Sequence, residues 1–149
     1  MYQTSLSKGQ ELVAQRMVKE FQRLGHDAYL ITSIYQDSVQ VVSPEEVKRR
    51  GGYVLQFDNE LRVHVIRVES EETSWPPRRI SFLNFMGVLD AIVADLKLNV
   101  LITHSTLWNG PEEVLKFVAW RRRMVAEGAP QTQLVFCHMS HYQEASDER

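Results

Sequence analysis

Three residues at loop positions could do chemistry in this chain. His104 and His138 each follow an apolar run that is typical of a buried strand, and Gly9 stands just before a predicted helix. An imidazole at a strand end can hydrogen-bond a hydroxyl or an anionic oxygen. The free backbone N–H groups and the positive dipole end of a helix favour anions. A lone histidine at a strand end is also commonly a surface residue or a satisfied polar group, so spacing alone leaves both interpretations open.

Several familiar sites are excluded by their missing motifs. The sequence has no G-x-G-x-x-G fingerprint, no G-x-x-x-x-G-K-[ST] phosphate loop and no G-x-S-x-G elbow. His138 and His141 form a pair too short and isolated for a metal site, which needs further ligands. The single Cys137 cannot form an internal disulfide, and there is no C-x-x-C pair. We therefore expect chemistry without a metal or a bound cofactor, in a reducing compartment.

Composition indicates one globular domain. The 149 residues are 44% apolar, which is enough for a core, and the formal net charge of -2 gives no field that favours nucleic acid. Basic clusters at residues 48–50, 78–79 and 121–123 are interpreted as solvated helix faces or termini, with peripheral membrane contact through them as the alternative. Because no signal peptide and no apolar run of ~20 residues is present, we predict a cytoplasmic protein.

Helical and strand patterns alternate along the chain. The predicted helices occupy the segments between Gly9 and Gly25, Ser43 and Gly51, Ile80 and Leu96, and Asn109 and Gly128. The predicted strands are Ala28–Ser33, Tyr53–Phe57, Leu61–Val68, Leu98–Thr103 and Gln133–Cys137, the first and the last two buried. Such alternation implies right-handed crossovers, and it predicts a Rossmann-like α/β fold with a mainly parallel sheet and helices on both faces. Ligands of such sheets bind beyond the carboxyl ends of the strands.

Three residues carry more specific structural predictions. His64 and Arg67 are the polar residues of a strand in which Leu61, Val63 and Val65 alternate, so both are expected at the surface. Gly87 weakens the helix from Ile80 to Leu96 by ~1 kcal/mol relative to Ala, so it is expected to permit a close contact and not to end the helix.

The ordered series of motifs resembles the family 4 glycosyltransferases of GT-B fold. The family opening, G-x-E-x-x-V-x-x-[LM]-x-x-x-[LF]-x-x-x-G-H-[DE]-x-x-[LV]-[IV]-T, is carried by Gly9, Glu11, Val13 or Leu12, Met17, Phe21, Gly25, His26, Asp27 and Thr32. R-V-H-V-I-R-V-E, the segment from Ile80 to Ser105 and L-V-F-C-H-M-S continue the resemblance over nearly the whole chain. The chain departs from the family in having Lys8 where a second glycine is usual, and residues 1–6 are too short and polar for the family's first strand.

The resemblance implies a function for the whole chain. Residues 1–149 would be the acceptor-side N-terminal domain of a retaining glycosyltransferase, which moves a sugar from a nucleotide-sugar to a glycan or small-molecule acceptor. It implies catalysis at His138, and contacts to donor or substrate at Lys8, Gly9, His104, Ser105 and Ser140. The absence of a D-x-D pair agrees with the metal-independent chemistry of this architecture. A C-terminal donor-binding domain, in cis or in trans, would be needed, so we expect the isolated chain to be inactive.

Two further expectations follow. If the first strand is absent, neighbouring strands expose unpaired backbone edges, which favours self-association. The alternative function is a stand-alone α/β module that binds an anionic small molecule or a protein partner and catalyses nothing. Equilibrium binding of nucleotide-sugars and glycan acceptors would separate the two functions.

Overall fold

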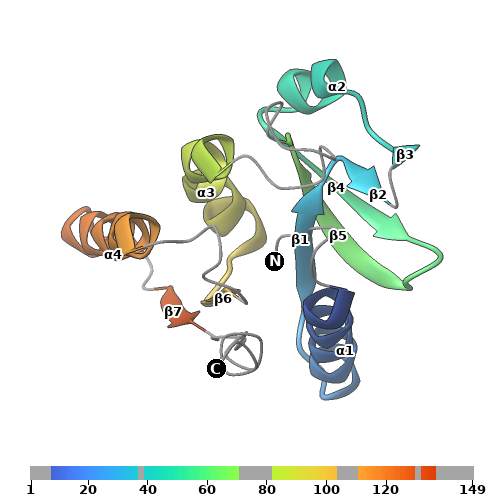
Figure 1. Cartoon of the computed structure of the whole chain (residues 1–149). Coiled ribbons are helices and arrows are strands. Elements are labelled where there is room, and N and C mark those ends of the chain that lie inside the picture. Colours follow the sequence, from blue (N-terminus) through green and yellow to red (C-terminus); the bar gives the residue numbers. More distant parts are fainter. Residues whose placement is uncertain (1–7, 37–38, 71–81, 104–110, 130–131, 137–149) are drawn as a thin grey trace, which may run out of the picture. The chain divides into compact units, whose positions relative to one another are not determined.

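The structure is a computed structural model that describes residues 8–36, 39–70, 82–103, 111–129 and 132–136. The chain divides into two compact units, Met1–Lys97 and Leu98–Arg149. The first unit contains α1 (Lys8–Arg23), β1 (Tyr29–Ser33), β2 (Tyr35–Gln36), β3 (Val39–Gln40), α2 (Pro44–Arg49), β4 (Tyr53–Asp58), β5 (Val63–Val68) and α3 (Phe82–Leu96) (Figure 1). The second contains β6 (Val100–Thr103), α4 (Pro111–Ala126) and β7 (Gln133–Phe136).

The helix ends of the first unit form where the local sequence predicts them. The Ser43 side chain accepts a hydrogen bond from the Glu46 N–H at 3.1 Å, and Pro44 occupies the first position of α2. Gly25 follows α1 with a φ of 95°, a conformation that most other residues adopt only with strain. The His26 N–H then donates to the Phe21 carbonyl at 2.9 Å, which satisfies one of the free carbonyls at the end of the helix.

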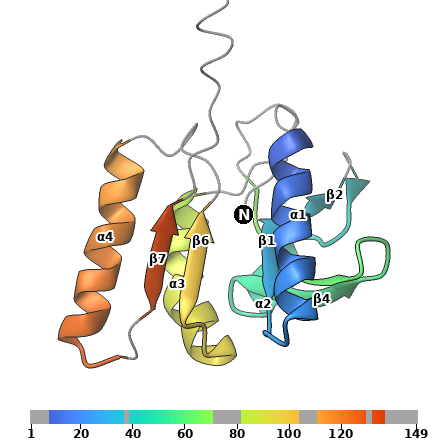
Figure 2. The same cartoon turned by 90° about the horizontal axis from the view of Figure 1, so that it is seen from below.

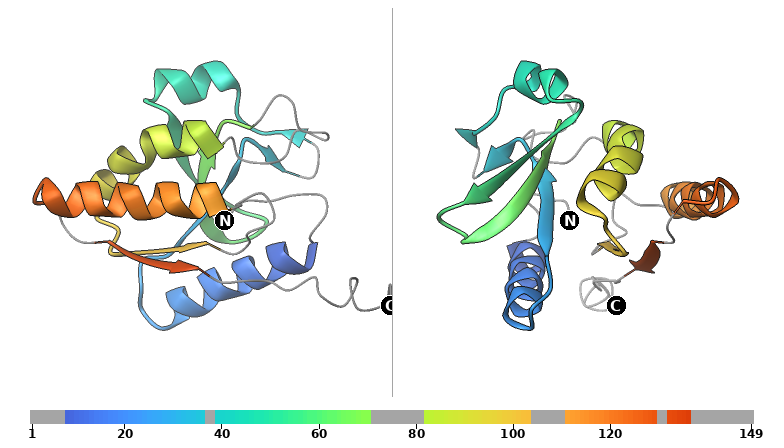
Figure 3. Two further views of the ribbon diagram at one scale, coloured as in Figure 1. Left: turned by 60° about the vertical axis from the view of Figure 1, so that its left-hand side comes forward. Right: turned by 180° about the vertical axis from the view of Figure 1, so that it is seen from behind.

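The sheet of the first unit is mixed, with strand order β1-β5-β4. β1 runs parallel to β5, with Ser33 opposite Val68, whereas β4 is antiparallel to β5 (Figure 3). β2 and β3 form a separate antiparallel pair. The prediction of a mainly parallel sheet is therefore not confirmed. Only the four residues 59–62 separate β4 from β5, which is enough for a hairpin and too few for the crossover that a parallel pair needs.

The two faces of this sheet pack against different helices. On one face, Leu30, Val63 and Val65 form a core with Ala14 and Val18 of α1. Farther along the same face, Val54 packs with Val47 of α2, Ile34 and Val42. The other face meets α3, because the hydroxyl of Tyr53 donates to the carboxylate of Asp95 at 2.5 Å. The helices of this unit thus cover both faces of its sheet.

A close contact between β4 and α3 depends on Gly52. A Cβ at this position would lie 2.2 Å from Cγ1 of Val88, and the φ of Gly52 is 112°. Gly87 lies inside α3, as predicted, but a Cβ there would meet nothing within 4 Å. The expectation of a close contact at Gly87 is therefore wrong, since the neighbour that needs space is Val88.

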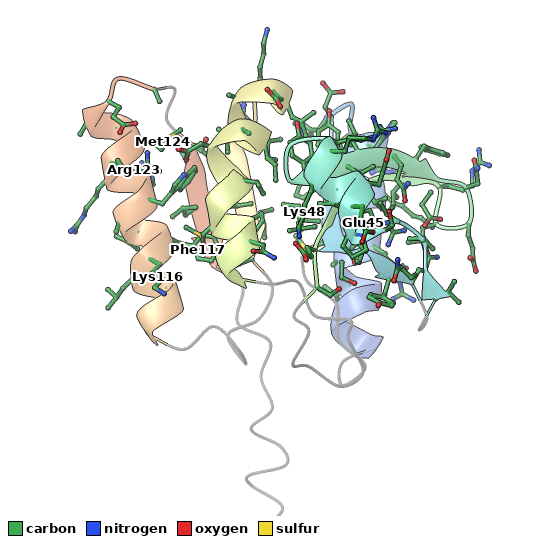
Figure 4. The ribbon with its side chains drawn as sticks, turned by 90° about the horizontal axis from the view of Figure 1, so that it is seen from above. Glu45, Lys48, Lys116, Phe117, Arg123 and Met124 are labelled. Atoms are coloured by element: carbon green, nitrogen blue, oxygen red, sulfur yellow. The ribbon has the colours of Figure 1, made fainter. Side chains whose placement is uncertain are left out.

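The second unit is a parallel pair of strands with one helix against it. β6 and β7 run in the same direction beside α4 (Figure 2), and Phe117 and Met124 are buried on the side of α4 that faces β7 (Figure 4). Val100 of β6 and Val135 of β7 are 46% and 41% exposed. The prediction that these two strands are buried is therefore only partly correct, because burial alternates along β6 as it does in a strand covered on one side.

No helix within the described ranges has both the length and the apolar character needed to cross a membrane.

Candidate functional site

The carboxyl ends of β1 and β5 share one edge of the first unit with the start of α1. Five residues connect α1 to β1, and α1 packs on the face formed by both strands, so helix and strands run in opposite directions. A helix of 16 residues is about 24 Å long, whereas a strand of five residues spans about 17 Å. The first turn of α1 therefore reaches the edge at which β1 and β5 end.

Two of the residues that the resemblance selected lie in this first turn. α1 begins at Lys8, so Gly9 belongs to the helix and does not precede it as expected. The N–H of Gly9 is nevertheless one of the first four, which have no partner within a helix. The partial positive charge of these groups gives the edge an affinity for anions.

The second unit also brings two strand ends to one edge. Thr103 at the end of β6 lies opposite Phe136 at the end of β7. His104 directly follows Thr103 in the sequence, and His138 comes two residues after Phe136. His104, Ser105, His138 and Ser140 themselves lie outside the described residues.

Two buried hydroxyl groups at these strand ends have no hydrogen-bond partner in the described part of the chain. They belong to Ser70, which comes two residues after β5, and to Thr103. Ser70 is 7% exposed and Thr103 is 8% exposed. Leaving a buried hydroxyl unpaired costs about 1 to 3 kcal/mol, so each position is an unfavourable one for the fold alone.

Two other buried hydroxyl groups are satisfied. The Ser33 hydroxyl accepts from the Tyr35 N–H at 3.1 Å and donates to the Tyr35 carbonyl at 3.3 Å. The Thr132 hydroxyl, just before β7, donates to the Leu98 carbonyl at 2.9 Å. Within the described ranges, the two unpaired hydroxyls thus both occur where strands of parallel pairs end. This is the part of an α/β sheet where ligands bind.

Polar side chains also connect the end of β5 to α3. Glu69 lies between Val68 and Ser70 in the sequence, and its carboxylate accepts a hydrogen bond from Nδ2 of Asn84 at 3.1 Å. Asn84 is in the first turn of α3. The bond holds the Glu69 carboxylate at the same end of β5 as the Ser70 hydroxyl.

Sequence reasoning missed Ser70 and Thr103. The only signal was that each comes at the polar end of an apolar run, V-I-R-V-E-S and N-V-L-I-T. Many structural serines and threonines share that position. Ser70 and Thr103 differ from such residues in that their hydroxyls have no hydrogen-bond partner among the described residues. The sequence does not show this, because a partner can come from a residue far away in the chain.

Arg67 in β5 was expected at the surface, and the structure corrects this. Its side chain is only 3% exposed, and its guanidinium pairs with Asp58, whose side chain is 7% exposed, at 3.2 Å. The other four hydrogen bonds go to the side chains of Gln56 and Gln36 and to the carbonyls of Ser33 and Tyr35. β5 buries Arg67 because this face is also covered by the segment that leaves β1. His64 is exposed, as predicted.

The Arg67 cluster is structural. A guanidinium has five N–H groups, and five hydrogen bonds account for all of them. Burial lowers the pKa of Arg67, and the charge of Asp58 opposes that effect. Asp58 is occupied as well, since its other oxygen accepts from the N–H groups of Glu60 and Leu61. No donor of the guanidinium is left for a ligand.

Comparison of the chain with protein-family models, curated proteins and solved structures gave no match.

Proposed function

We propose that this chain is the acceptor-side N-terminal part of a retaining glycosyltransferase with GT-B architecture. In this proposal a C-terminal half, in cis or in trans, binds the nucleotide-sugar. The chain itself contributes the acceptor site and some of the contacts to the donor. The proposal rests on the ordered resemblance to family 4 glycosyltransferases. It includes a Rossmann-like fold for this chain.

One observation of the structure carries most of the support. The first turn of α1, with Lys8 and Gly9, lies at the edge where the parallel strands β1 and β5 end. A ligand at this edge would meet unpaired helix N–H groups, which favour a diphosphate, and the strand-end hydroxyl of Ser70, which suits a sugar. Both chemical groups are present in a reaction between a nucleotide-sugar and a hydroxyl acceptor.

Residue roles follow from this assignment. His138 would hydrogen-bond a sugar hydroxyl or the departing diphosphate, and such a bond to a charged group is worth roughly 1.5 to 3 kcal/mol. His104, Ser105 and Ser140 would contact the donor or the substrate. Contacts of this kind speed the reaction only if they strengthen in the transition state.

The test is transfer activity of the protein translated through the coding sequence that follows Arg149, with a panel of nucleotide-sugars and acceptors. His138→Ala should lower turnover by about ten- to a hundredfold. His141→Ala, three residues farther into the same segment, is the matched control and should change turnover by less than about threefold. Residues 1–149 alone should show no transfer, because both substrates must be oriented in one cleft.

Clear turnover by residues 1–149 alone would contradict the two-domain proposal. Equal losses in the two histidine variants would remove the assignment of His138. A longer protein that binds glycans but transfers nothing would favour the non-catalytic binding module.

A further inference from the structure

The hydroxyl of Ser70 is the polar group whose position the fold explains least. It is buried, with 7% of the residue exposed, and it has no hydrogen-bond partner among the described residues. Ser33 offers a direct comparison. It is also buried, at 0% exposed, and it lies opposite Val68 at the end of the neighbouring strand, but both hydrogen bonds of its hydroxyl go to Tyr35.

A buried hydroxyl that lacks a protein partner retains its full capacity to donate and to accept a hydrogen bond. At the carboxyl end of a parallel strand it lies where ligands of α/β sheets bind. The N-terminal end of α3 is at the same strand end, because Asn84 holds the carboxylate of Glu69 at 3.1 Å. The polar groups of this strand end therefore include a hydroxyl, an amide and a carboxylate.

The chemistry of these groups selects a neutral partner over an anion. A carboxylate next to Ser70 in the sequence repels a phosphate or another carboxylate, whereas it accepts a hydrogen bond from a sugar hydroxyl. A sugar hydroxyl can also donate to and accept from the serine hydroxyl. A neutral polyhydroxyl ligand thus fits this strand end better than a charged one does.

We propose that Ser70 is a binding residue for a hydroxyl group of a neutral sugar, with the carboxylate of Glu69, held by Asn84, as a second contact. This inference rests on the proposed function, in which the chain carries the acceptor site. It adds the class of acceptor group and the residues at the end of β5 that recognise it. Ser70 hydrogen-bonds the ligand and takes no part in bond breaking.

The first measurement tests whether the hydroxyl is unpaired in the protein without a ligand. Ser70→Ala should raise the melting temperature of the full chain by about 2 to 4 °C, because it removes a buried group that has no partner. The matched variant Ser33→Ala should lower it by a similar amount, since it removes two hydrogen bonds. A loss of stability in Ser70→Ala as large as that in Ser33→Ala would overturn the inference.

The second measurement tests the ligand with methyl α-D-glucopyranoside, a neutral sugar, followed by amide chemical shifts. At about 10 mM the sugar half-fills a site with a Kd of that size. We expect shift changes at Glu69, Ser70 and Asn84, and a roughly tenfold weaker Kd in Ser70→Ala. Inorganic phosphate at the same concentration should leave these three amides unchanged.

The outcomes separate this inference from the proposed function. Sugar-dependent shifts confined to the ends of β6 and β7, an unchanged Kd in Ser70→Ala, or no shift at all would overturn the Ser70 site. None of these results concerns transfer by the longer protein. Conversely, sugar binding at Ser70 in a protein that transfers nothing would support the site and contradict the glycosyltransferase proposal.

Discussion

Arg67 and Ser70 are three residues apart along the chain, and both bury a polar group in or just after β5. They differ in what surrounds that group. Every N–H of the Arg67 guanidinium has a partner, whereas the Ser70 hydroxyl has none in the described part of the chain. Arg67 lies in the middle of the sheet, and Ser70 lies beyond its carboxyl edge.

Buried polar groups with partners and buried polar groups without partners affect the fold differently. A cluster in which each donor and acceptor is satisfied fixes the relative positions of the elements that supply them. Here these elements are β4, β5 and the segment that leaves β1. An unsatisfied group holds no neighbouring element in place and lowers stability, and this is the observation from which a ligand at Ser70 is proposed.

The largest expected effect comes from removing Arg67. Arg67→Met should lower the free energy of unfolding by roughly 3 to 5 kcal/mol, because Asp58 would remain as a buried charge without its partner. Urea unfolding followed by circular dichroism measures this loss. Arg50→Met is the control, since Arg50 makes an exposed ion pair with Glu46 and should leave the midpoint nearly unchanged. A loss of less than about 1 kcal/mol at Arg67 would break the comparison with Ser70.

A smaller effect is expected at Tyr53, whose satisfied hydroxyl joins β4 to α3. Tyr53→Phe should cost about 1 kcal/mol at neutral pH, because the hydrogen bond to Asp95 is lost. Burial, together with the bond to Asp95, raises the pKa of Tyr53 to about 12 from 10.0. The neutral phenol is therefore the form that the fold favours, and its contribution is complete below pH 10 and lost as the pH rises through about 12.

Unfolding midpoints between pH 8 and 12 test the prediction at Tyr53. The difference between the wild type and Tyr53→Phe should stay constant up to pH 10 and shrink above it. A difference that does not change across this range would mean that the hydroxyl of Tyr53 is not held in its neutral form.

The smallest effects extend the comparison to the second unit. Thr132→Val removes a hydroxyl that bonds to the Leu98 carbonyl, and it should cost about 1 kcal/mol. Thr103→Val removes an unpaired hydroxyl of similar burial, so it should be neutral or stabilise the chain by up to about 1 kcal/mol. Thermal unfolding of the two variants in parallel checks the signs. Equal losses in both would show that the Thr103 hydroxyl has a partner.

Features that depend on local sequence were predicted best. Ser43 and Pro44 start α2, and Gly25 follows the end of α1, because capping involves residues within one or two turns. The alternation of Val63 and Val65 also predicted β5 correctly. Arg67 is in phase with Val63 and Val65, so the alternation itself places it on their face of the strand, and only its polar side chain led to the expectation of a surface position.

The environment of Arg67 could not be predicted, since Ser33 and Gln36 are 34 and 31 residues away in the sequence. The candidate site likewise has features that the sequence shows and features that only the fold shows. A strand end is visible in the sequence, as at His104 and His138, but the lack of a partner at Ser70 is a property of the folded chain. Gln36 and Val39 belong to an antiparallel strand pair that the sequence from Ile34 to Val42 did not predict, because its two strands are too short to show a period.

The contact between Gly52 and Val88 limits how this sequence can change during evolution. A smaller residue at position 88 would remove the clash with a Cβ at position 52, but the φ of 112° would still disfavour any side chain there. No single neighbouring substitution can therefore compensate for the loss of this glycine. Among related sequences that keep the junction of β4 and α3, position 52 should remain glycine while position 88 varies, and the two positions should show little covariation.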